Sequence, residues 1–198
     1  GILVSLGHSD ADFDTCEAAA NAGARCVTHL FNAMSQMANR EPGLVGAALT
    51  LGGLSAGLIA DGIHVHPASV RAALAAKQGP GQMFLVSDAM AVAGSEAKEF
   101  ELNGRRVMRA GHRLTLEDGT LAGADLDLLT AVRNLVAWGA ANEDEALAMA
   151  TSVPAALCAG YAGLGHLRAG GKADVLHIVD GRPTCAAIWQ AVRCRVSS

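Results

Sequence analysis

The feature that most constrains the fold of this chain is a repeated alternation of short apolar runs with alanine-rich segments. Each apolar run ends in polar residues, and the runs occupy residues 2–6, 26–28, 54–60 and 82–86. Helical spacing follows at residues 11–22, where Ser9 or Asp10 is the expected N-cap, and at residues 67–77. Strands that alternate with helical or mixed connections form parallel sheets. We therefore predict an α/β fold built from βα units.

The spacing of apolar residues changes in the second half of the chain. Residues 99–121 have a β pattern, and Asn103-Gly104 within them is a strong hairpin signal. Predicted helices lie at residues 125–138, at residues 143–150 and near Val153. A glycine-bounded segment at 165–181 predicts a strand of a separate small β element. Residues 186–196 are compatible with either a strand or a terminal helix.

Composition excludes several classes of protein. Hydrophobic residues make up 51% of the 198 residues and charged residues 17%, which supports a buried core and excludes a disordered chain. The formal net charge of −4 disfavours a protein that coats nucleic acids or anionic membranes. Residues 43–60 carry no charge, but Gly52-Gly53 interrupts them, so we expect a helix or turn and then a buried strand instead of a membrane span. The five cysteines include no Cys-x-x-Cys pair, which favours a reduced, cytoplasmic setting.

Polar residues gather where the predicted strands end, which is where parallel βα folds hold their functional groups. They are His8, His29, Asn32, Asp61, His64 and Asp88. Adjacent strands lie about 4.8 Å apart, so the rings of His8 and His29 can reach one ion. Neutral imidazole binds Zn²⁺ and also Fe²⁺, Mn²⁺ and Co²⁺. Each histidine taken singly is better explained as a structural residue, but together they predict a metal site.

Two charged residues complete the candidate site. Asp88 can take a proton from bound water and pass it to a leaving group; its alternative role is that of a turn or helix-cap residue. Arg40 lies in a loop above the predicted site and suits a phosphate or carboxylate. The alternative for Arg40 is a solvated surface charge.

Six short motifs carry a resemblance to a known family. In chain order they are Gly7-His8-Ser9-Asp10-Ala11, Thr28-His29-Leu30-Phe31-Asn32-Ala33-Met34, Arg40-Glu41-Pro42-Gly43, Asp61-Gly62-Ile63-His64-Val65, Val86-Ser87-Asp88-Ala89-Met90 and Leu121-Ala122-Gly123. Their order and spacing, over essentially the whole chain, resemble the N-acetylglucosamine-6-phosphate deacetylase family of the amidohydrolase superfamily. The motif that begins at Thr28 is the most specific. Residues 171–175 also resemble a strand of the small β domain in many amidohydrolases.

The resemblance implies a role for each matching residue. His8 and His29 match the histidines that bind a divalent metal ion, with Zn expected first and Fe, Mn or Co as alternatives. Asp88 matches the catalytic aspartate, which accepts a proton from metal-bound water and then protonates the departing amine. The matching substrate-binding residues are Asn32, Ala33, Arg40, Asp61, His64, Leu121, Ala122 and Gly123.

The fold implied by the resemblance is part of a (β/α)8 TIM barrel with a small flanking β-sandwich domain. Residues 1–160 would supply barrel strands 5–8 of the catalytic domain, with a β-hairpin insertion at about 99–121. Residues 161–198 would supply the C-terminal segment of the small domain. We therefore expect the chain to be the C-terminal portion of a longer enzyme, whose third metal ligand, a glutamate, lies upstream. Residues 121–123 match a substrate-contacting loop of the family, and Ala124 stands where the family usually has serine after it, so a hydroxyl group is missing there.

The expected activity is hydrolysis of the N-acetyl amide of N-acetylglucosamine 6-phosphate to glucosamine 6-phosphate and acetate, in amino-sugar catabolism. The expected partner is this phosphorylated amino sugar, with no nucleic acid and no membrane, and the family suggests a homodimer. One alternative is another amidohydrolase, dihydroorotase-like or adenine deaminase-like, which Asn32-Ala33 and Arg40 disfavour. The other is a non-catalytic fragment or phospho-sugar binding module. Without the third ligand, the isolated 198 residues are expected to be poorly active.

Overall fold

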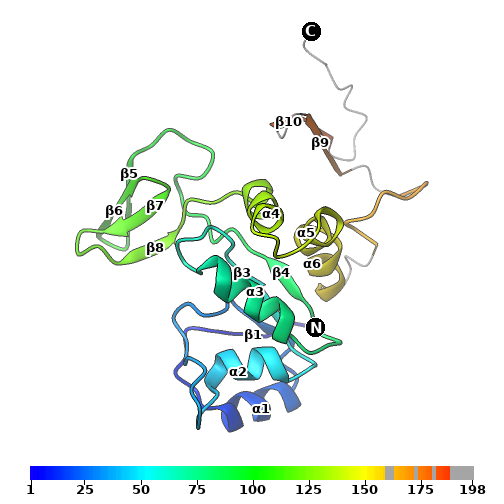
Figure 1. Cartoon of the computed structure of the whole chain (residues 1–198). Coiled ribbons are helices and arrows are strands. Elements are labelled where there is room, and N and C mark those ends of the chain that lie inside the picture. Colours follow the sequence, from blue (N-terminus) through cyan, green and yellow to red (C-terminus); the bar gives the residue numbers. More distant parts are fainter. Residues whose placement is uncertain (159–162, 172–173, 180–181, 188–198) are drawn as a thin grey trace.

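The computed structural model describes residues 1–158, 163–171, 174–179 and 182–187, and a parallel β-sheet forms its centre. The strands are β1 (Ser5–Leu6), β2 (Cys26–Val27), β3 (Ser55–Leu58) and β4 (Met83–Leu85), and they lie side by side in sequence order. Each strand pairs in parallel with the next. The prediction of an α/β fold with parallel βα units is therefore confirmed. Figure 1 shows the helices arranged around this sheet.

The strands are shorter than the apolar runs that predict them. Past the strand ends the backbone is no longer regular, but hydrogen bonds to the neighbouring strands continue. The amide of Thr28 donates to the carbonyl of Leu6 over 2.7 Å. The amide of Leu30 donates to the carbonyl of Gly57 over 2.8 Å. Residues that follow β2 are thus still held by both neighbouring strands.

Helices occur where the sequence predicts them. The helices α1 (Phe13–Asn21), α2 (Gly43–Thr50) and α3 (Pro67–Ala76) connect successive strands, and α4 (Leu128–Ala137), α5 (Glu143–Ala150) and α6 (Ser152–Leu157) follow β4. The last three contact β4, and α1 packs on α2. The prediction of a helix or turn in the uncharged stretch is confirmed by α2.

The N-cap of α1 is Asp12, so the prediction of Ser9 or Asp10 is wrong. The Asp12 carboxylate accepts a hydrogen bond of 2.9 Å from the amide of Thr15. The hydroxyl of Ser9 instead accepts the amide of Ala11 over 3.1 Å, before the helix begins. The Ser9 carbonyl accepts the amide of Ser35 in the next loop.

The helices and the parallel sheet enclose one apolar core, built largely from alanine, leucine and valine. Nearly all of α2 is buried in it, which explains why residues 43–60 carry no charge. None of the helices formed by the described residues is long and apolar enough to cross a membrane. The uncharged stretch is thus a buried helix followed by the buried strand β3, as expected.

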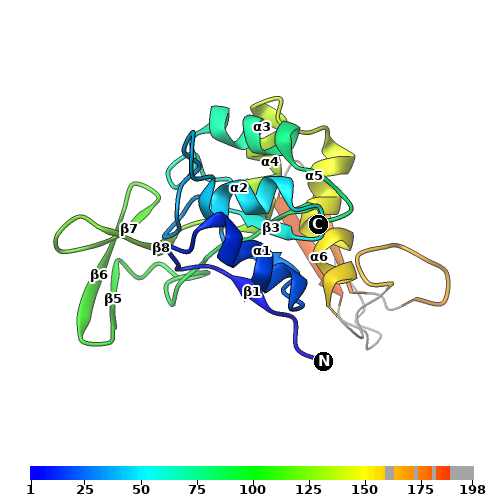
Figure 2. The same cartoon turned by 90° about the horizontal axis from the view of Figure 1, so that it is seen from below.

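A second, antiparallel sheet contains β5 (Glu99–Leu102), β6 (Arg105–Ala110), β7 (Arg113–Leu116) and β8 (Leu121–Ala124). Figures 1 and 2 both show it projecting away from the helices. It has a small core of its own, formed by Val92, Val107 and Leu114. The turn predicted at Asn103-Gly104 is confirmed, because β5 and β6 pair on either side of it.

This sheet extends beyond the predicted hairpin, which ends at residue 121. Leu121–Ala124 forms the strand β8, whereas the family resemblance implies that residues 121–123 are a loop. A run of leucine, alanine and glycine has no polar–apolar alternation, so the sequence offers no strand signal there. The predicted β insertion is therefore a four-stranded antiparallel sheet that extends to Ala124.

A small antiparallel sheet follows the helices. It consists of β9 (Val175–Val179) and β10 (Arg182–Ala187), which confirms the strand predicted within residues 165–181. Most of the segment whose structure the sequence leaves open, residues 188–196, lies outside the described residues. Residues 172–173 of the late motif also lie outside them.

Truncation of a core side chain tests the placement of β3. Leu58 is fully buried, so Leu58→Ala is expected to lower the free energy of unfolding by about 2–5 kcal/mol. Leu167 is 85% exposed, so the matched control Leu167→Ala should change it by less than about 0.5 kcal/mol. Urea denaturation followed by circular dichroism measures both values. Equal losses in the two variants would contradict the burial of β3.

Candidate active site

Two histidines meet where β1 and β2 end. His8 follows Gly7, and His29 follows Thr28. The Nε2 atoms of the two histidines lie 2.8 Å apart, and the rings meet edge to face with their centroids 4.7 Å apart. Gly7 permits this approach, because a Cβ atom at Gly7 would lie only 2.9 Å from the Cβ of Thr28. The structure therefore brings together the two residues predicted to be metal ligands.

The candidate catalytic residues share an uncommon backbone conformation. The φ angle is +47° at His8, +21° at His29 and +49° at Asp88. Residues other than glycine rarely adopt positive φ, and such strain concentrates at functional sites. Each of the three lies just after a parallel strand. All three residues thus have a backbone conformation that persists only where the surrounding structure enforces it.

The histidine pair fits two ligands of one metal ion. His29 is only 6% exposed, and its Nδ1 atom has no hydrogen-bond partner among the described residues. Its Nε2 atom faces Nε2 of His8 at 2.8 Å, slightly less than the separation of about 3.3 Å for two nitrogens bound to a tetrahedral zinc ion. No group of three or more His, Cys, Asp or Glu side chains in the described ranges could hold a metal. These residues thus offer two ligands, whereas a catalytic zinc site has three.

Asp61 and His64 form a buried pair after β3. Nδ1 of His64 lies 2.6 Å from Oδ2 of Asp61, and each side chain is 7% exposed. The other carboxylate oxygen, Oδ1, accepts the amides of Ile63 and His64, both at 2.8 Å. In α4, Asn134 donates to the carbonyl of Ala60 over 2.8 Å and anchors this turn. Both carboxylate oxygens of Asp61 therefore have hydrogen-bond partners within the turn that Asp61 begins.

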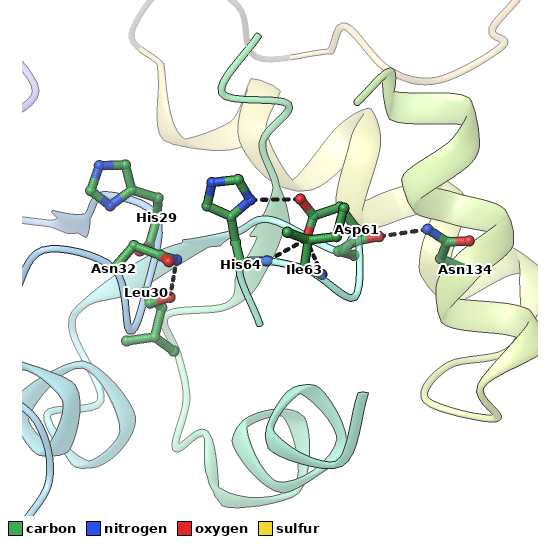
Figure 3. A network of polar contacts seen from close by, with 8 residues as sticks. His29, Leu30, Asn32, Asp61, Ile63, His64 and Asn134 are labelled. Atoms are coloured by element: carbon green, nitrogen blue, oxygen red, sulfur yellow. Dashed lines mark hydrogen bonds and ion pairs between the residues drawn. The ribbon is translucent and has the colours of Figure 1, made fainter. Parts of the chain in front are cut away.

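This geometry affects the charge of Asp61 and the orientation of His64. Burial acts to raise the pKa of Asp61, but hydrogen bonds from the His64 ring and from two backbone amides outweigh it and hold this pKa below its ordinary value. Because Nδ1 of His64 pairs with the carboxylate, Nε2 is left for another partner. Figure 3 shows the rings of His64 and His29 projecting to the same side of the chain.

Asp88 lies after β4 and against the antiparallel sheet. Its carbonyl accepts the amide of Ala124 over 2.8 Å, and Ala89 forms an isolated parallel bridge with Ala124. Gly123 passes so close that a Cβ atom there would lie 3.0 Å from the Asp88 carbonyl oxygen and 2.5 Å from Cγ of Met90. The structure thus places Asp88 beside β8, the strand that carries three predicted substrate-binding residues.

The loop between β2 and α2 carries the remaining predicted residues. Nδ2 of Asn32 donates to the carbonyls of Leu30 at 3.1 Å and His29 at 3.3 Å. Ala33 is exposed and has a φ angle of +48°. Arg40 is also exposed, and within the part of the chain that the structure describes it has no hydrogen-bond or ion-pair partner. The structure does not join Arg40 to any other described residue of the predicted site.

Two residues outside the predicted site hold this loop. Oε1 of Glu41 accepts the first amides of both α1 and α2 at 2.9 Å. The hydroxyl of Ser35 donates to the Ala11 carbonyl over 2.6 Å and accepts the Leu44 amide over 2.8 Å. An acidic residue before a helix is a recognisable signal in a sequence, so the role of Glu41 could have been predicted from the sequence. Ser35 joins segments that are distant in sequence, and no local pattern indicates this.

Comparison with known proteins identifies a family and several relatives that are similar to this chain. The profile of the Amidohydrolase family matches residues 1–196. The chain is 41% identical to the N-acetylgalactosamine-6-phosphate deacetylase of Shewanella sp. (strain ANA-3), over 96% of this chain and 48% of that protein. It is 42% identical to the N-acetylglucosamine-6-phosphate deacetylase of Bacillus subtilis (strain 168), over 68% of this chain and 34% of that protein.

Two solved structures are also similar. The N-acetylglucosamine-6-phosphate deacetylase from Pasteurella multocida superposes with a TM-score of 0.91 at 31% identity, covering 98% of this chain and 51% of that one. A mutant N-acetyl-D-glucosamine-6-phosphate deacetylase from Mycobacterium smegmatis, in complex with N-acetyl-D-glucosamine-6-phosphate, has a TM-score of 0.83 at 30% identity, covering 95% and 50%. The chain thus spans about half the length of the solved relatives it matches.

The lowered pKa of Asp61 predicts a pH-dependent contribution to stability. A carboxylate whose pKa is lowered by folding stabilises the protein above its unfolded pKa of about 3.9, and this stabilisation is lost as the pH falls through the folded pKa. Asp61→Asn is therefore expected to cost about 1.5–3 kcal/mol at pH 7 and clearly less at pH 3. The exposed carboxylate of Asp14 on α1 provides the control Asp14→Asn. Urea denaturation at both pH values measures the effect, and an unchanged cost of Asp61→Asn at pH 3 would refute it.

Proposed function

Because this chain belongs to the amidohydrolase family, we propose that it carries catalytic and substrate-binding residues of an N-acetylhexosamine 6-phosphate deacetylase. The observation that carries this proposal is the pair of facing imidazoles, His8 and His29, at adjacent strand ends of a sheet that also ends in Asp88. Two imidazole nitrogens and a carboxylate at one edge of a parallel sheet are the groups that metal-assisted amide hydrolysis requires.

The proposed substrate is N-acetylglucosamine 6-phosphate, which would be converted to glucosamine 6-phosphate and acetate. The names of the Bacillus and Pasteurella relatives specify this sugar. A second candidate is N-acetylgalactosamine 6-phosphate, because the Shewanella relative named for it aligns with 96% of this chain. The two sugars differ only in the configuration of one hydroxyl group, so the amide chemistry would be the same.

The chemistry divides between a metal ion and the residues of this chain. When bound by His8 and His29, a divalent ion, zinc first and iron, manganese or cobalt as alternatives, would polarise the amide carbonyl and activate water. The carboxylate of Asp88 would accept the proton of the attacking water and deliver it to the nitrogen of the sugar amine as the C–N bond breaks. The positive φ angles at these residues would hold the side chains ready for this reaction.

The phosphate group would be held by the loops after β2 and β3. Nε2 of His64 is free of the Asp61 contact and can donate to a phosphate oxygen. The exposed guanidinium of Arg40 can form paired hydrogen bonds with the same group. Asn32 and Ala33 would contact the substrate from the loop after β2, and Leu121, Ala122 and Gly123 from β8. Asp61 would contribute through His64, because both of its oxygens are already occupied.

We further propose a position for the chain within the family fold. β1 to β4 would be strands 5–8 of a (β/α)8 barrel, residues 1–160 the partial catalytic domain and residues 161–198 part of a small β domain. Coverage of about half of each solved relative supports this placement. The third metal ligand would be a carboxylate outside the described residues, and the assembly would be a homodimer.

Single substitutions in the protein made from its complete open reading frame test the function. His29→Asn, which suits a positive φ angle, is expected to lose bound metal and at least ~100-fold in activity. Asp88→Asn should keep the metal but lose about 10²–10⁴-fold in kcat. The exposed His112 in the turn between β6 and β7 also has positive φ, so His112→Asn is a matched control. Acetate release from both epimers and metal analysis are the readouts; full activity in both site variants would refute the assignment.

The role of Arg40 predicts a difference between phosphorylated and unphosphorylated substrates. Arg40→Gln removes a charge-assisted contact, so KM for the sugar phosphate is expected to rise roughly 10-fold or more. Slow turnover of unphosphorylated N-acetylglucosamine should stay the same. Arg105 is an exposed arginine in β6, and Arg105→Gln serves as the control. Equal losses on both substrates would remove the phosphate role of Arg40.

A further inference from the structure

Arg109 in β6 joins two segments of the chain that flank Asp88. Its Nε donates to Oδ2 of Asp125 over 2.8 Å, and its Nη1 donates to the carbonyl of Ser95 over 2.6 Å. Ser95 lies in the segment that leaves Asp88, and Asp125 immediately follows β8. One guanidinium therefore connects the outgoing chain of Asp88 to the end of the strand that runs beside it.

The partners of Arg109 adjoin the backbone contacts of Asp88 itself. Ala124, the residue before Asp125, donates its amide to the Asp88 carbonyl. Met90 and Val92, which follow Asp88, pack into the small core of the antiparallel sheet. Asp88 and the segment after it are thus bound to the sheet by backbone hydrogen bonds, from Ala124 to Asp88 and from Arg109 to Lys98, by an apolar contact region and by the side chain of Arg109. A movement of the sheet would carry the Asp88 backbone with it.

The Arg109 pair differs from the other ion pair of the same strand. The side chains of Arg109 and Asp125 are 25% and 12% exposed, whereas those of Arg106 and Glu99 are 55% and 53% exposed. Exposed pairs contribute little because water screens them. A largely buried carboxylate that loses its partner costs the folded protein much more free energy than an exposed one. Loss of Arg109 would therefore loosen the contact between Asp125 and the segment after Asp88.

We propose that Arg109 is a positioning residue for Asp88, and that the antiparallel sheet acts through it to hold the carboxylate in place for proton transfer. This inference rests on the proposed deacetylase function. Arg109 touches neither the predicted metal ligands nor a predicted phosphate contact among the described residues. Its removal should therefore affect the chemical step more than substrate binding.

Kinetics of matched variants in the full-length protein test this proposal. Arg109→Gln is expected to lower kcat roughly 10- to 100-fold, because a displacement of about 1 Å can cost a factor of 100. KM and metal content should stay within about twofold of the wild type. Arg106→Gln on the same strand should change nothing. Arg109→Lys, which keeps the charge but cannot make both contacts at once, should fall in between.

Amide hydrogen exchange provides a readout that does not depend on activity. The amide of Ala124 donates to Asp88, so its exchange should accelerate at least tenfold in Arg109→Gln and stay unchanged in Arg106→Gln. If Arg109→Gln fails to fold, Asp125→Asn weakens one of the two Arg109 contacts and should give smaller losses in the same direction. Equal kcat and equal exchange in the Arg109 and Arg106 variants would overturn the inference. A wild-type protein that releases no acetate from either epimer would instead overturn the proposed function, while the exchange comparison would still test the link.

Discussion

The parallel register of β1 to β4 determines where the candidate metal ligands and the two aspartates lie. Parallel strands bring their carboxyl ends to one edge of a sheet, so His8 and His29, 21 positions apart in sequence, meet at 2.8 Å. The same order places Asp61 and His64 after β3 and Asp88 after β4. A shift of one residue in β2 would point Thr28 where His29 now points. The register is held by the apolar core, so burial of leucine and valine determines the geometry of the polar site.

Local signals made a large part of this structure predictable. The helix at Glu143–Ala150 has the bounds that the sequence predicts, because its capping box, Asn142 with Glu145, lies within four residues. The meeting of His8 and His29 followed from strand order alone. The strand β8 and the Arg109 link could not be predicted, because each depends on a partner that only tertiary packing supplies. The cap of α1 is a local contact, from the amide of Thr15 to Asp12, but several polar residues precede this helix and the pattern does not select among them. The loop that carries Arg40 is predicted by the sequence, but the distance of Arg40 from the other candidate residues is not encoded by any local pattern.

The site contains two aspartates whose surroundings suit different tasks. Asp61 is buried, both of its oxygens accept hydrogen bonds, and its pKa is lowered. A carboxylate held in this way keeps its charge near neutral pH and cannot exchange protons readily. Asp88 is held by its backbone carbonyl, and the described residues leave its carboxylate without a hydrogen bond. This contrast supports the proposal that Asp88, and not Asp61, is the residue that transfers the proton.

Backbone strain links the fold to this chemistry. A non-glycine residue with positive φ persists only where its surroundings leave no alternative, and three candidate catalytic residues have this conformation. At His29 the constraint comes from hydrogen bonds on both sides, from Thr28 to β1 and from Leu30 to β3. At Asp88 it comes from β8, through Ala124 and the close passage of Gly123. The antiparallel sheet thus supplies for Asp88 the backbone support that the neighbouring strands supply for His29, although this sheet projects away from the helices (Figure 1).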